Sequence, residues 1–107
     1  MNKIGECKNC CTSLKLFPDY ASSSLWCSKC GVGVGNPHLT FPNVPENIFE
    51  EINFWNNMWD IASSYKEYNI PAIEDEITLW GLKLAEKLNR YVPCEFDFEN
   101  SKLDKKQ

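Results

Sequence analysis

Residues 25–35 read LWCSKCGVGVG, a Cys-x-x-Cys pair followed directly by three glycines in five residues. Three kinds of site share these features: a metal-binding knuckle, a redox dithiol and a glycine-rich phosphate loop. A dinucleotide-binding loop needs a strand before it and the start of a helix directly after it. Here Asn36 and Pro37 follow, and the pattern predicts no helix before Pro45. We therefore expect the glycines to give the backbone conformational freedom rather than to bind phosphate.

A second Cys-x-x-Cys pair, Cys7 to Cys10, lies sixteen residues before the pair at 27 and 30. Two such pairs at this separation match a four-thiolate zinc site, because two intervening residues let both sulfurs reach one ion. We therefore predict a structural Zn²⁺ as the cofactor, with the ligands Cys7, Cys10, Cys27 and Cys30. Two disulfides or a redox dithiol are the alternatives. A thioredoxin-like dithiol would need a βαβ setting, which this sequence pattern does not indicate.

Between the two pairs, CTSLKLF reads as a strand, PDYASS as a turn and SLW as a returning strand. With the two cysteine pairs, this hairpin resembles the zinc-ribbon superfamily over residues 5–35, about a third of the chain. The resemblance implies a β-hairpin closed by a four-cysteine zinc site, with Gly31 at a position that often requires positive φ. Cys11 departs from the superfamily pattern, which commonly has glycine there, and Cys94 and His38 are surplus to the site. Zinc ribbons serve many unrelated functions, so the resemblance predicts a site and not an activity.

The sequence changes character over residues 36–45, where three prolines predict an extended connector without helix. Apolar residues at steps of three and four then predict helices over 45–68 and 72–91, and Gly81 would let the two approach closely. Alternation in CEFDF, residues 94–98, predicts a short strand. We thus predict a small α+β fold: a zinc ribbon over 1–35, a connector over 36–45, an antiparallel two-helix hairpin with a short strand over 46–98, and a fraying polar tail over 99–107.

Charge and hydropathy exclude several classes of partner. The N-terminal MNKIGECKNCC has no apolar core of a secretion signal, and no apolar run approaches the ~20 residues of a membrane helix. We therefore expect a cytoplasmic protein with no membrane partner. The first 45 residues carry a net charge of +2 and the rest −6, which gives the overall −4. The larger half would repel phosphate, so we expect a protein partner, one with a basic surface, rather than a nucleic acid.

Residues 46–98 contain ten aromatic side chains, more than a two-helix hairpin alone can enclose. We expect Trp55, Trp59 and Trp80 in the core. Others would pack on the ribbon, in a homodimer or against a partner, since tryptophan and tyrosine are favoured interface residues. The partner-binding candidates are rings at the margins of the first helix and carboxylates near the helix starts: Phe49, Glu50, Phe54, Tyr68, Glu74 and Asp75.

We predict no catalytic residues, because the chain has one histidine and no evident nucleophile paired with a base. A zinc ion held by four thiolates also has no open position for water. The leading hypothesis is a non-enzymatic inhibitor that binds and blocks another protein, as immunity proteins, antitoxins, phage-encoded inhibitors and anti-sigma-like regulators do. The alternative is a transcription- or nucleic-acid-associated zinc ribbon that contacts its target through Lys8, Lys15 and Lys29. A metal-dependent enzyme would need three protein ligands and a water on the zinc.

Overall fold

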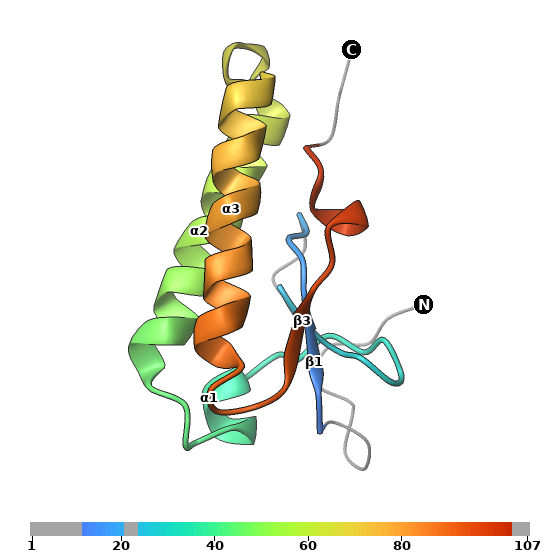
Figure 1. Ribbon diagram of the computed structural model, residues 1–107, viewed down its shortest axis with the longest axis vertical. Coiled ribbons are helices and arrows are strands. Elements are labelled where there is room, and N and C mark those ends of the chain that lie inside the picture. Colours follow the sequence, from blue (N-terminus) through green and yellow to red (C-terminus); the bar gives the residue numbers. More distant parts are fainter. Residues whose placement is uncertain (1–11, 21–23, 104–107) are drawn as a thin grey trace.

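The computed structural model describes residues 12–20 and 24–103. Three short strands form one sheet: β1 (Leu14–Leu16), β2 (Leu25–Cys27) and β3 (Cys94–Phe96). Two long helices, α2 (Glu46–Ser64) and α3 (Pro71–Leu88), lie side by side along the sheet, and a short helix, α1 (Pro37–Thr40), lies near one end of the pair (Figure 1). Two 3₁₀ turns complete the chain, η1 (Lys66–Tyr68) and η2 (Glu99–Ser101). The predicted α+β class is confirmed.

The sheet is mixed, with strand order β2-β1-β3. Strand β1 pairs antiparallel with β2, placing Leu14 opposite Cys27, and pairs parallel with β3, placing Leu14 opposite Cys94. Side chains alternate across a strand, so Leu14 and Leu16 face the helices while Lys15 faces away. The last strand of the chain therefore completes the sheet begun by the first, and a single hydrophobic core includes residues from both halves.

The helices bury one stripe each because their apolar residues recur every three or four positions. Trp55 of α2 is fully buried at the centre of the core, and its indole N–H donates to the Ile77 carbonyl of α3 at 2.9 Å. Gly81 of α3 leaves room for this ring: an added Cβ would lie 2.6 Å from Trp55 Cζ2 and 2.5 Å from Phe96 Cε1. The sequence predicts only that Gly81 lets the two helices approach closely. The glycine also provides space for two aromatic rings, one from α2 and one from β3.

The connection between the helices differs from the prediction. The predicted helix over 45–68 ends at Ser64, where Tyr65 becomes extended with φ −111° and ψ 123°, and a separate turn, η1, follows. Asn69, at the end of this turn, has φ −91° and so does not adopt the left-handed conformation that often ends a helix. Ile70 is extended because it precedes Pro71, and Pro71 occupies the first turn of α3, where a missing N–H costs nothing.

Two segments predicted to lack structure are ordered by local hydrogen bonds. The connector contains α1, which starts at Pro37 and closes with a 2.7 Å bond from the Phe41 N–H to the Pro37 carbonyl, so the prediction of no helix there is wrong. The predicted fraying tail packs on the core as far as Leu103, which is 3% exposed. Trp59 Nε1 donates to the Ser101 carbonyl at 3.2 Å, and this bond ties the tail to α2.

Candidate metal centre and interaction surface

A tight turn follows β2 and holds the second cysteine pair. The Gly31 N–H donates to the Cys27 carbonyl at 2.9 Å, and the Cys27 N–H donates to the Val32 carbonyl at 2.8 Å. Gly31 has φ 77°, which a residue with a Cβ adopts at a cost, so the expected role of this glycine is confirmed. The Cys27 side chain is buried, and Cys30 lies on the exposed side of the turn. The backbone here has the reversal that a two-cysteine metal knuckle requires.

The other two predicted ligands, Cys7 and Cys10, lie outside the described residues, as does Cys11. Within residues 12–20 and 24–103, no three histidine, cysteine or acidic side chains come together as a metal site. The described half of the predicted site is the Cys27–Cys30 turn. Two thiolates from such a turn are soft donors of the kind that suits zinc.

Cys94 and His38, the surplus candidates, occupy other positions. Cys94 begins β3 and lies across β1 from Cys27, because both residues are opposite Leu14. Burial, helped by the negative charge of Glu95, raises the pKa of the Cys94 thiol to about 12. In the absence of a bound metal ion, this thiol therefore holds its proton more tightly than a free cysteine does. His38 is on α1, where it is exposed.

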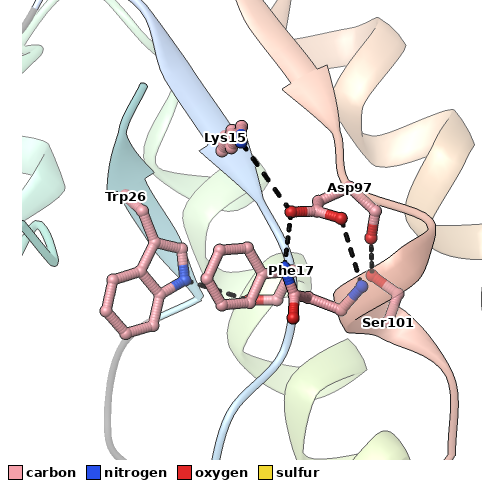
Figure 2. Close-up of polar contacts among 6 residues, drawn as sticks. Lys15, Phe17, Trp26, Asp97 and Ser101 are labelled. Atoms are coloured by element: carbon pink, nitrogen blue, oxygen red, sulfur yellow. Dashed lines mark hydrogen bonds and ion pairs between the residues drawn. The ribbon is translucent and has the colours of Figure 1, made fainter. Parts of the chain in front are cut away.

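The face of the sheet away from the helices carries polar and aromatic contacts (Figure 2). Trp26 stacks on Phe17 with ring centroids 4.7 Å apart, and its indole donates to the Phe17 carbonyl at 3.2 Å. Asp97, just after β3, lies 3.9 Å from Lys15 Nζ of β1 and accepts two hydrogen bonds from Asn100. Burial opposes the charge on Asp97, but the Asn100 bonds and Lys15 outweigh it and hold the pKa of this carboxyl below its usual value.

Replacing Asp97 with asparagine is expected to lower the free energy of unfolding by about 1 kcal/mol at neutral pH, through loss of the charge-assisted contacts. Because the folded-state pKa is the lower one, the unfolded chain takes up the proton first, and the contribution is lost as pH falls below about 4. Urea unfolding of both proteins from pH 7 to pH 2 measures this difference in unfolding free energy, which should narrow as the pH falls below about 4. Glu99→Gln, at an exposed pair with Lys102, is the control and should change little. If the difference in unfolding free energy between the two proteins stays constant or widens as the pH falls, the stabilising role of the Asp97 carboxylate is refuted.

The six predicted partner-binding residues divide by their burial. Phe49 is 5% exposed and belongs to the hydrophobic core, so its ring offers little surface to a partner. Phe54 and Tyr68 are 58% and 47% exposed. Glu50 on α2 and Asp75 on the first turns of α3 are also exposed. Glu74 instead accepts a 2.8 Å hydrogen bond from the Leu103 N–H and so helps to hold the C-terminal segment on the core.

A groove of about 670 Å³ lies between α2 and α3 near η1. Its walls are mainly apolar and include one carboxylate; the lining residues are Met58, Ile61, Ala62, Tyr68, Ile73, Glu76, Ile77 and Trp80. Apolar spacing alone groups Phe54, Met58 and Ile61 with the buried stripe as one wide apolar face. The signal that could have separated them is their position on the flank of that stripe, which leaves them beside the core and not within it.

Glu51 fixes one wall of the groove. Its carboxylate accepts hydrogen bonds from Trp80 Nε1 and Lys87 Nζ, each at 3.0 Å, and so bridges α2 and α3. The bond from Trp80, followed by that from Lys87, lowers the pKa of Glu51, which remains ionised at neutral pH. From sequence, Glu51 is expected only to complement the helix dipole. The edge of the Phe54 ring contacts Trp80 at a centroid distance of 5.8 Å, which holds the indole in place from the other side.

The α2–α3 groove is thus an apolar, partly preorganised recess among carboxylates, which is suited to binding another molecule.

None of the helices in the described part of the chain is long and apolar enough to cross a membrane. Comparison of this chain with protein-family models, with curated proteins and with solved structures found no significant match.

Proposed function

We propose that the protein is a non-enzymatic interaction module that binds and blocks a partner protein through an acidic surface on α2 and α3. In this proposal a Zn²⁺ ion on Cys7, Cys10, Cys27 and Cys30 forms a zinc ribbon that stabilises the sheet. The ion acts as a fold determinant, since four thiolates leave no coordination position for a substrate. The inhibitor class suggested by the sequence, the immunity, antitoxin, phage-inhibitor or anti-sigma type, stays part of the proposal.

The observation that carries the proposal is the coincidence of exposed apolar side chains with negative charge. Residues 46–76 contain eight carboxylates and a single basic residue, Lys66. The same segment exposes Phe54, Ile61 and Tyr68 by 40% or more. Apolar patches rimmed by charge typically mark protein interaction sites, and the sign of the charge favours a basic partner.

Of the two lysines of the nucleic-acid alternative that the structure describes, Lys29 is exposed. Lys15, another of the three lysines that this alternative requires, is paired with Asp97 across β1 and β3. The acidic α2–α3 segment would repel a phosphate backbone. We therefore retain the protein-binding function alone.

Affinity capture from the source cell, with metal-loaded full-length protein as bait, tests this function. We expect one protein to be retained by the wild-type bait, lost with a Glu50→Lys/Asp75→Lys bait, and eluted by raised salt. Glu95→Lys/Glu99→Lys, a matched charge reversal at exposed sites on and after β3, should keep the partner. Equal retention by both variant baits, or retention of nucleic acid in place of protein, would contradict the proposal.

A further inference from the structure

We infer that the α2–α3 groove binds an amphipathic helix of the partner, one with apolar residues on one face and Lys or Arg beside them. This inference rests on the proposed binding function and assigns its site. The groove has two apolar ridges with the same spacing. Met58 and Ile61 line it on α2, and Phe54, one turn before Met58, extends their row beyond the lining to contact Trp80. This row has the spacing i, i+4 and i+7, and Ile73, Ile77 and Trp80 run along α3 at the same intervals.

The dimensions of the groove suit a short helix. Seven residues at 1.5 Å each give ridges about 10 Å long, or two turns, which matches apolar anchors at i, i+4 and i+7 on a docked helix. Ridges of this spacing on two neighbouring helices form the grooves into which the side-chain ridges of a third helix pack. The described edge of β2 is less open to an added strand, because Gly33 bridges to Trp26 and the Val34 N–H bonds the Leu25 carbonyl.

The walls are preorganised before any partner arrives. Trp80 is held by the 3.0 Å bond to Glu51 and by the edge contact with Phe54. Tyr68, at the end of the groove next to the helix connection, contacts Tyr65 edge to face at 6.5 Å. Side chains that are already fixed lose less conformational entropy on binding, which favours affinity.

Charge selects the occupant. Glu76 lines the groove, and Asp75 and Glu67 lie exposed in the adjoining turns, so the connected end of the hairpin, beside the groove, is acidic. A second copy of this chain would bring the same negative surface to the contact, which disfavours a homodimer here. Lys or Arg residues flanking the apolar face of a helix would meet carboxylates instead.

A Leu/Lys peptide of about 18 residues, long enough to form a helix, is the probe. Its leucines recur at i, i+4 and i+7, and two control peptides carry the same residues scrambled or glutamate in place of lysine. We expect the Leu/Lys peptide to bind the metal-loaded protein in calorimetry, with a gain in helical circular dichroism, and both control peptides to bind at least tenfold more weakly.

Ile61→Asp is the informative protein variant. Ile61 is 40% exposed, so folding is retained, and the new carboxylate would strengthen any nonspecific attraction for a basic peptide. We nevertheless expect at least a tenfold rise in Kd, because the apolar contact is lost; Phe54→Asp, at a 58% exposed ring, provides a second such variant. Leu79→Asp is the matched control, since Leu79 is 49% exposed on α3 and does not line the groove; it should leave Kd unchanged or lower it.

Equal binding of the Leu/Lys peptide to wild type and Ile61→Asp would overturn the groove assignment. Binding of the glutamate peptide to wild type as tightly as the Leu/Lys peptide would overturn it too. A dimer in sedimentation that Ile61→Asp dissociates, with no peptide binding by wild type, would assign the groove to a second copy and overturn the inference as well. A captured partner that Glu50→Lys/Asp75→Lys loses and Ile61→Asp keeps would overturn the groove while leaving the proposed function in place. Loss of both partner capture and peptide binding in Ile61→Asp, with both retained in Leu79→Asp, would support the inference.

Discussion

A Cys27→Ser protein is expected to lose its bound zinc and, with it, the cooperative folding of the sheet. Cys27 is 1% exposed at the end of β2, in the turn closed by Gly31. Structural zinc contributes about 10–16 kcal/mol of apparent binding free energy in small modules, which matches or exceeds the whole stability of a typical domain. Serine cannot replace the thiolate, so the remaining three ligands hold the ion weakly.

Metal analysis of the purified protein and thermal unfolding followed by circular dichroism measure this effect. The wild-type chain should carry one zinc, and a strong chelator should reproduce the unfolding of the variant. Cys94→Ser is the control, because this thiol is on β3, which lies on the opposite side of β1 from Cys27. It should retain one zinc per chain. A Cys27→Ser protein with one tightly bound zinc and a cooperative transition would disprove the ligand assignment.

The second large effect is expected at Gly81, where alanine should destabilise the fold despite its better helix propensity. Propensity alone would favour alanine by about 1 kcal/mol. The new Cβ would lie within 2.6 Å of Trp55 and Phe96, however, and overpacking of this kind costs about 1–3 kcal/mol. Neither ring can move cheaply, since Trp55 is fully buried and its indole is bonded to the Ile77 carbonyl. After subtraction of the propensity gain of about 1 kcal/mol, we expect a net loss of up to about 2 kcal/mol.

A fall in Tm of roughly 4–8 °C per kcal/mol makes this change measurable by thermal unfolding. Gly35→Ala is the matched control, because Gly35 is exposed and does not have positive φ. That variant should be neutral or slightly more stable, since alanine restricts the unfolded chain. Stabilisation by Gly81→Ala would mean that the rings are not packed against the glycine.

The helical part of the fold could be predicted because its signals are local. Apolar spacing and Pro71 place α2 and α3 within a few residues of their observed bounds. The break at Tyr65 has no such signal, because the apolar spacing continues through it to Tyr68. The parallel pairing of β3 with β1 joins segments that are distant in sequence, so no local pattern could specify which strand it would join.

The candidate site was predictable to a similar degree. The Cys27–Cys30 turn and the positive φ of Gly31 follow from residue types at fixed spacing. Exposure of a helix flank depends on what packs against it, which the sequence does not state. For this reason, spacing alone predicts Phe49 at the surface, whereas the structure buries it. Spacing likewise predicts Trp80 in the core, whereas the structure places it in the lining of the groove.

The coordination of the proposed zinc ion bears on fold and function together, because a closed site would assign the ion to folding and leave function to the helices. Zinc-edge X-ray absorption of the metal-loaded full-length protein would resolve the ligand shell. We predict four sulfur ligands at about 2.3 Å. Three protein ligands together with a water oxygen would contradict the closed site and indicate a catalytic metal.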